Sequence, residues 1–167
     1  MIATPINLGH SDAAEQEAAY ETHLTSRFGE IQVLVDSIID FPDGLIGLGG
    51  SRYALLRTDA KSPFVWLQSL TDPGIALPVT NPHRFFGDFA VQLADEEAER
   101  LGLANAEPAD VFVTVTAASA LAEFTANTKA PILVREGHGH QVLNQAPGGA
   151  VKTPLFPGLA DNTAQAG

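Results

Sequence analysis

Short apolar runs separated by strong turn signals constrain the fold of this chain more than any other feature. Residues 28–35 alternate apolar and polar side chains, as expected of a strand with one buried face. The runs on either side of Pro42-Asp43-Gly44 and of Thr71-Asp72-Pro73-Gly74 are interrupted by typical turn sequences. This spacing favours a mainly β fold, a small closed or nearly closed antiparallel barrel or sandwich, over alternating βαβ units. The other predicted strands are 37–41, 53–57, 64–68, 75–80 and 111–116, with a hairpin formed by 132–135 and 141–144.

One short helix is predicted between these strands. Asp95 is placed to cap its N-terminus, acidic residues follow in its first turns, and Gly102 is a typical stop after Leu101. Residues 1–24 are predicted to be a flexible extension with a weak helix over 11–20, because they lack large apolar side chains. The β domain is therefore expected to span 25–156, and residues 157–167 to form a flexible tail.

The chain contains no cysteine, which excludes disulfides, thiolate metal sites and cysteine nucleophiles. Its first residues have neither the basic nor the apolar segment of a signal peptide. No stretch approaches the ~20 apolar residues that a spanning helix needs. We therefore expect a cytoplasmic protein that does not bind a membrane.

The formal net charge is −11, from twenty acidic residues against nine Lys and Arg. Such a chain repels phosphate groups, so direct nucleic-acid binding is not expected, whereas a basic protein partner would be attracted. The segment 88–110 is rich in acids and contains Arg100 as its one base. The alternative interpretation is a solvated helix with acids near its N-terminus, in a protein that is acidic for solubility.

His138 and His140 are the one arrangement that suggests chemistry. On a strand, two histidines at this spacing share a face, as metal ligands of a β-barrel enzyme must. Gln145 stands where a carboxylate ligand would be expected, however, and glycines surround the pair, so a polar turn is preferred. No nucleophile elbow or phosphate-binding loop is present. The sequence thus predicts no enzyme and no cofactor.

Several uncommon motifs occur in a fixed order, and together they resemble the FliW family of bacterial flagellar assembly factors from about Thr25 to Phe156. The chain departs from the family pattern at Ile46, where a second proline is usual, and at Leu48-Gly49, where Phe-Glu is usual. The motifs that carry the resemblance are Phe28-Gly29-Glu30-Ile31, Ile38-Ile39-Asp40-Phe41-Pro42-Asp43-Gly44-Leu45-Ile46-Gly47, Pro63-Phe64-Val65-Trp66-Leu67-Gln68-Ser69 with Asp72-Pro73, Thr125-Ala126-Asn127-Thr128-Lys129-Ala130-Pro131-Ile132, and Gly139-His140-Gln141-Val142-Leu143.

The resemblance implies a regulator with two protein partners, flagellin and the RNA-binding translational repressor CsrA. Flagellin would occupy the protein while it accumulates, and after its export the freed protein would bind CsrA and relieve repression. A flagellin chaperone with no role in translation is the alternative. Candidate residues for an apolar flagellin groove are Phe41, Leu45, Ile46 and Leu48, which could instead plug the end of a barrel. Candidate acids for CsrA are Glu30, Asp40, Asp88 and Glu96.

Overall fold

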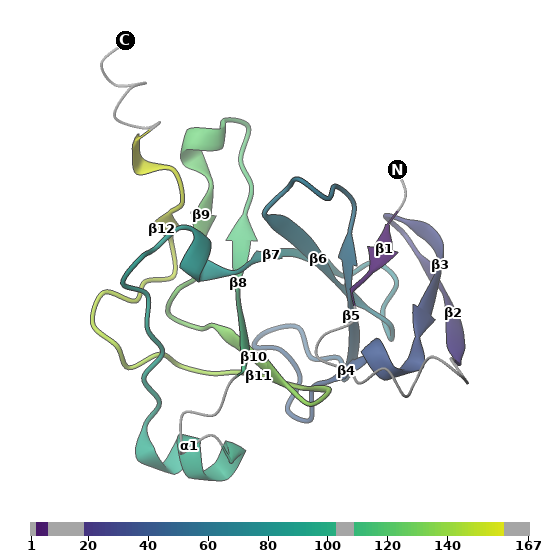
Figure 1. The fold of residues 1–167 in the computed structure, drawn as a ribbon, viewed down its shortest axis with the longest axis horizontal. Coiled ribbons are helices and arrows are strands. Elements are labelled where there is room, and N and C mark those ends of the chain that lie inside the picture. Colours follow the sequence, from purple (N-terminus) through teal and green to yellow (C-terminus); the bar gives the residue numbers. More distant parts are fainter. Residues whose placement is uncertain (1–2, 7–18, 103–108, 159–167) are drawn as a thin grey trace.

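Seven β-strands of the described chain close into a barrel (Figure 1). The computed structural model describes residues 3–6, 19–102 and 109–158. Around the barrel the strands follow the order β4–β5–β6–β7–β8–β10–β11, and β11 pairs with β4 to complete the ring. The elements are β1 (Thr4–Pro5), β2 (Tyr20–Thr25), β3 (Gly29–Leu34), η2 (Val35–Ser37), β4 (Ile39–Asp40), β5 (Arg52–Arg57), β6 (Phe64–Ser69), β7 (Ala76–Thr80), η3 (Pro82–Arg84), α1 (Asp95–Leu101), β8 (Asp110–Thr116), η4 (Leu121–Glu123), β9 (Thr125–Ala126), β10 (Ile132–Arg135), β11 (His138–Gln141) and β12 (Thr153–Pro154), where η marks a 3-10 helix.

The pairings around this ring are antiparallel except at one seam. There β11 runs parallel to β4, with His138 opposite Asp40. The predicted mainly β, closed antiparallel fold is therefore confirmed, with this one parallel contact added.

The central strand β5 is buried on both of its faces. Tyr53 and Leu55 point into the barrel core, whereas Ala54 and Leu56 belong to a second apolar cluster outside the barrel. That second cluster is closed by the β2–β3 hairpin, which contributes Val33. Because β5 has an apolar layer on each side, its residues read as a continuous apolar run rather than as an alternating one.

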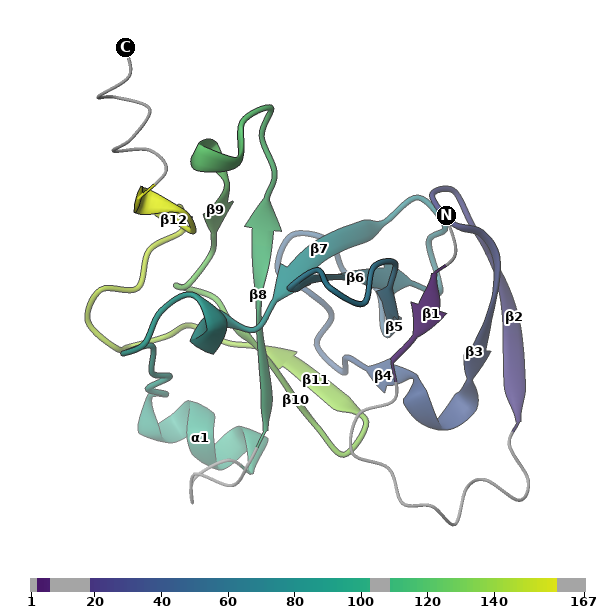
Figure 2. The ribbon, with the colours of Figure 1, turned by 45° about the horizontal axis from the view of Figure 1, so that its top comes forward.

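A small sheet extends from the far end of β8. The first half of β8 pairs with β10, and its second half pairs with β7 and with β9, which in turn pairs with β12 (Figure 2). A phenylalanine-rich cluster packs beneath this sheet, where Phe64 contacts Phe85, Phe124 and Phe156. The sheet and cluster anchor the C-terminal part of the described chain onto the barrel.

The N-terminal segment differs from the prediction of a flexible extension over 1–24. Strand β1 pairs with β5, and β2 pairs along its whole length with β3. In β2, Glu21 and His23 face the barrel and Tyr20 and Leu24 face away, an alternation that is too polar to stand out in the sequence. The weak helix predicted over 11–20 lies outside the described residues except for its end, where Tyr20 begins β2. Most of the predicted tail 157–167 also lies outside them.

The predicted helix is confirmed, but its N-terminal cap is not Asp95. The cap position is Ala94, which has no side-chain cap, and Asp95 lies in the first turn. Gly102 ends the helix in the left-handed conformation with φ 71°, as predicted. No helix in the described ranges is long and apolar enough to cross a membrane.

The last hairpin and the strand before Phe41 also differ in their bounds. Glu136 and Gly137 both have positive φ, at 51° and 78°, so they form the two-residue turn themselves and β11 begins at His138. The predicted second strand at 141–144 is therefore displaced, and the two histidines lie on a strand rather than in a turn. Likewise the predicted strand 37–41 is divided between η2 and the short β4.

Candidate binding surface

The loop between β4 and β5, residues 41–51, is held in a fixed conformation by its own backbone. The Gly44 N–H donates to the Phe41 carbonyl, and the Gly49 N–H donates to the Leu45 carbonyl, both at 3.0 Å. Gly44 has a φ of 68°, and a Cβ there would lie 3.1 Å from the Cα of Gly49. The turn predicted at Pro42-Asp43-Gly44 therefore needs glycine both for its backbone angle and for its close approach to the returning chain.

The four apolar candidates of this loop divide into two pairs. Phe41 and Leu45 are 0% and 4% exposed and belong to the barrel core, so they do not line a surface groove. Ile46 and Leu48 are 60% and 43% exposed and project from the tip of the loop. The sequence could not separate the pairs, because all four are apolar residues within one turn-rich segment.

Two side-chain hydrogen bonds hold the tip of this loop to the barrel. The Tyr53 hydroxyl donates to the Gly49 carbonyl at 2.8 Å, and burial raises the pKa of that hydroxyl. The Ile46 N–H donates to Oε1 of Gln141, whose Nε2 donates to the Ala130 carbonyl. Ile46 is thus an exposed apolar side chain on a backbone that strand β11 fixes in place.

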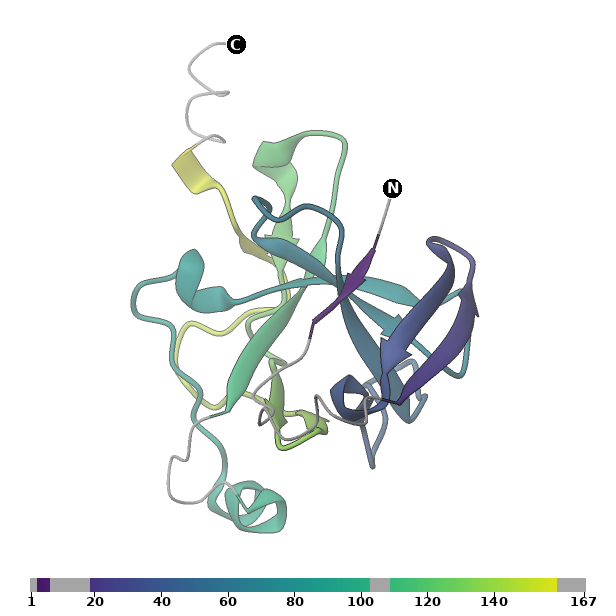
Figure 3. The same ribbon diagram turned by 45° about the vertical axis from the view of Figure 1, so that its right-hand side comes forward.

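An acidic helix lies beside the loop. Arg100 of α1 donates to Asp43 of the loop at 2.9 Å and to Glu97 of its own helix at 3.1 Å. These hydrogen bonds raise the pKa of the guanidinium. We call Ile46, Leu48 and the acids of α1 the loop–helix surface. No α1 residue is buried, and Figure 3 shows the helix standing off from the barrel, so its acids are presented to solvent.

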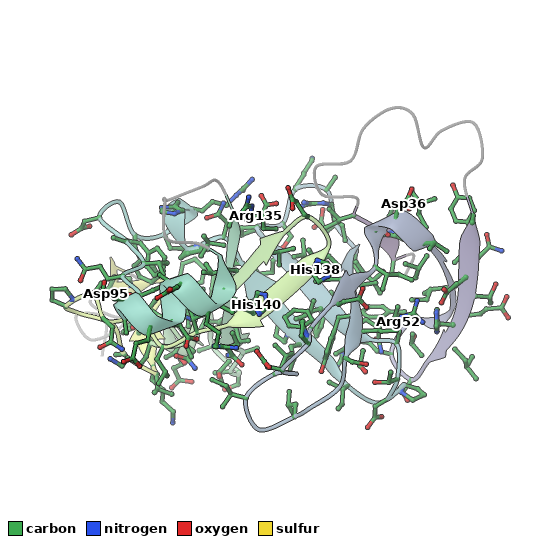
Figure 4. The ribbon with its side chains drawn as sticks, turned by 90° about the horizontal axis from the view of Figure 1, so that it is seen from below. Asp36, Arg52, Asp95, Arg135, His138 and His140 are labelled. Atoms are coloured by element: carbon green, nitrogen blue, oxygen red, sulfur yellow. The ribbon has the colours of Figure 1, made fainter. Side chains whose placement is uncertain are left out.

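The two histidines lie under the C-terminal end of this helix. His138, His140 and Arg135 line a cavity of about 230 Å³ with Leu101 and Gly102 (Figure 4). His140 Nδ1 lies 4.0 Å from the Asp43 carboxylate, and burial lowers the pKa of His140 although Asp43 acts in the opposite direction. Within the described ranges, no group of three or more His, Asp or Glu side chains is arranged to hold a metal ion.

The acidic candidates are not brought together on one face. Glu30 lies exposed on β3 and Asp40 on β4. The pKa of Arg52 is raised chiefly by its hydrogen bond to Glu21 and to a smaller extent by the charge of Asp40. Asp88 lines a separate cavity of about 350 Å³, and Glu96 lies in the first turn of α1. Figures 1 and 2 place the β2–β3 hairpin and α1 on opposite sides of the barrel. The four acids therefore do not form one cluster: Asp40 lies at the base of the apolar loop, and α1, which carries Glu96, is joined to the loop through Asp43 and Arg100.

Sequence reasoning missed the ion pair that joins loop and helix. Asp43 and Arg100 are separated by 57 positions, and each has a plain local role, one in a turn and one near a helix end. No periodic pattern links two such residues, so only the fold reveals that they meet.

The barrel and its loop–helix surface define a small β-barrel protein whose exposed features suit contacts with other proteins. The model of the FliW protein family matches residues 22–155, and the chain belongs to this family of flagellar assembly factors.

Individual relatives give the same result. The flagellar assembly factor FliW of Geobacter sulfurreducens is 33% identical over 142 residues, which cover 84% of this chain and 89% of that protein. The FliW of Nitratidesulfovibrio vulgaris is 38% identical over 116 residues, covering 68% and 67% of the two chains. A crystal structure of the flagellar assembly factor FliW superposes with a TM-score of 0.72 at 26% identity, covering 82% of this chain and 98% of the other.

Proposed function

We propose that this chain acts in the cytoplasm by binding flagellin and by antagonising the translational repressor CsrA, so that flagellin synthesis is coupled to its export. The observation that carries the proposal is the loop–helix surface, on a chain of the FliW family. Its two kinds of side chain, apolar and acidic, suit the two kinds of partner. The role requires binding equilibria that compete and no catalytic step.

The apolar part of the surface supports flagellin binding. Ile46 and Leu48 are exposed on a loop whose backbone is already ordered, so little conformational entropy is lost when a partner covers them. An amphipathic helix of flagellin could bury both side chains. Phe41 and Leu45 support the loop from below and make no direct contact in this proposal.

The acidic part of the surface supports CsrA binding. The first turns of α1 carry Asp95, Glu96 and Glu97, and the single arginine of the helix is already engaged by Asp43 and Glu97. A basic RNA-binding protein would be attracted to these carboxylates, chiefly through a faster association. Glu96 is therefore our first candidate. The exposed acids Glu30, Asp40 and Asp88 are tested as alternatives.

Calorimetric titration of the protein with flagellin and, separately, with CsrA bound to flagellin-leader RNA tests both parts. Replacing Ile46 and Leu48 together by serine is expected to weaken flagellin binding at least tenfold. Leu121→Ser is the matched control, because Leu121 is 47% exposed on η4 and not on the loop. Unchanged flagellin affinity of the double variant would remove the loop from the binding site.

For CsrA, Glu96→Gln is compared with Glu123→Gln, an exposed glutamate on η4. We expect slower association and weaker RNA release for the first variant only, with a strong dependence on salt. The variants Glu30→Gln, Asp40→Asn and Asp88→Asn then locate any acid that contributes from another surface. Flagellin binding without any CsrA binding would instead establish the flagellin-only chaperone.

A further inference from the structure

Strand β2 has an edge that no other strand of the described residues covers. Among the residues that the structure describes, β2 pairs only with β3, and Figures 1 and 2 show it as the outermost strand of the molecule. Its six residues, Tyr-Glu-Thr-His-Leu-Thr, include neither the proline nor the lysine that commonly blocks an exposed edge. Tyr20 and Leu24 on its outer face are 61% and 71% exposed. An edge without these two residues and with exposed apolar side chains can pair with another strand.

The hydrogen-bond pattern of the hairpin shows which groups point to this edge. The Val35 N–H donates to the Ala19 carbonyl, so the pair 19–35 is hydrogen-bonded within the hairpin. In an antiparallel ladder such pairs alternate along the strand. Given the register Tyr20–Leu34 and Thr22–Gln32, the backbone N–H and C=O groups of Tyr20, Thr22 and Leu24 therefore point away from β3.

These groups match a second copy of the same strand. A two-fold axis through Thr22 places Thr22 opposite its equivalent and Tyr20 opposite Leu24 of the second copy. All three outward-pointing residues then lie in hydrogen-bonded pairs, which provide about six backbone hydrogen bonds. The exposed Tyr20 and Leu24 side chains also fall opposite each other on the same face, where cross-strand contacts form.

The charges of the side chains favour this register over the registers whose axis is shifted by one residue. With the axis at Thr22, Glu21 faces His23 of the second copy, an acceptor opposite a potential donor. An axis at Glu21 would place two glutamates directly opposite each other, and like charges in that position destabilise a sheet, whereas an axis at His23 would leave Glu21 with no histidine opposite it. The Glu21 carboxylate is already held by Arg52 at 3.0 Å and by His23 at 2.9 Å, contacts that lower its pKa and keep it ionised and in place.

We propose that two copies of this chain associate by antiparallel pairing of β2 with β2, centred on Thr22, into a continuous sheet β3–β2–β2–β3. The contact is small, so it belongs to the weak class of interfaces and forms at high protein concentration. This self-association uses none of the residues of the loop–helix surface, and Figures 1 and 2 place α1 on the opposite side of the barrel from β2.

Single cysteines test the register directly, because the chain has no cysteine of its own. Thr22→Cys places two thiols across the axis with their Cα atoms about 5.5 Å apart, within the range of a disulfide. Tyr20→Cys is the matched control. In this register the two copies of position 20 are four residues apart along the strands, so their Cα atoms are separated by more than about 13 Å. Under mild oxidation we expect covalent dimer from Thr22→Cys at a rate at least tenfold that of Tyr20→Cys. Equal rates, or no dimer from either variant, would overturn the proposal.

The unmodified chain supplies a second readout. Sedimentation equilibrium from about 10 to about 500 µM should show the mass rising above the 17.6 kDa of one chain. Thr22→Pro removes an N–H that points to the open edge and that β3 does not use, so it should fold and remain monomeric, whereas Thr22→Ala should still associate. A mass that stays at 17.6 kDa for the unmodified chain across the range refutes the pairing.

Discussion

Replacement of Phe41 by alanine separates a core role from a binding role for the loop between β4 and β5. The ring is 0% exposed and packs edge-on against Tyr53 with 5.1 Å between centroids. It also fills the space above Gly139, where any Cβ would overlap it. Truncating a buried phenylalanine removes its transfer free energy and leaves a cavity, which costs about 3–5 kcal/mol. We place Phe41→Ala in the upper half of that range, because the aromatic contact is lost as well.

Urea unfolding measures this loss, and Trp66, the single tryptophan, is its fluorescent probe. With a slope of roughly 2 kcal/mol per molar urea, the midpoint should fall by about 2 M. Ile46→Ala is the control, since its side chain is 60% exposed, and it should change the unfolding free energy by less than about 0.5 kcal/mol. A loss below about 1 kcal/mol for Phe41→Ala, or equal losses for both variants, would refute the division of this loop into core and surface residues.

Three further predictions concern the core and its titration. Gly139→Ala should destabilise by about 1–3 kcal/mol in the same urea titration, because the added methyl group overlaps the Phe41 ring. Asn144→Ala should lower the free energy of unfolding by about 2–4 kcal/mol. The buried amide of Asn144 donates to the Ala90 and Thr128 carbonyls and accepts from the Gln92 and Ala146 N–H groups. Gln145→Ala, at an exposed position, should leave the free energy of unfolding almost unchanged. Burial lowers the pKa of His140, so the unfolded chain binds a proton at this imidazole more readily than the folded chain does. The free energy of unfolding should therefore be highest above pH 6.5 and fall as the pH drops below that value. His140→Gln should flatten that dependence between about pH 7 and pH 5, and an unchanged profile would contradict it.

Local chemistry explains which parts of the fold were predictable from sequence. The strands β5, β6, β7 and β8 were predicted to within one residue at every end, because each is an apolar run bounded by turn residues. Gly102 likewise ends α1 where its backbone freedom predicts. Strand β2 was missed because its inward side chains, Glu21 and His23, are polar, and an Arg52 contact that cannot be seen in the sequence stabilises one of them.

The candidate site was less predictable, for the reason that surfaces are assembled from distant segments. Composition and charge indicated an acidic segment and an apolar loop, and both occupy the expected positions along the chain. Only the fold shows that Ile46 and Leu48 face solvent while Phe41 does not. Only the fold shows that the loop adjoins α1 rather than the acid Glu30.

The parallel seam between β4 and β11 sets the order in which this barrel can be completed. Asp40 pairs with His138, so the ring closes only after almost the entire sequence between them has been made and arranged. Contacts between such distant residues carry a large loop-closure entropy, which slows refolding. A chain emerging from the ribosome therefore holds β4 and β5 in an unclosed sheet until β11 arrives. Because the seam forms last, substitutions in it should chiefly raise the rate at which the folded barrel opens and leave the folding rate nearly unchanged.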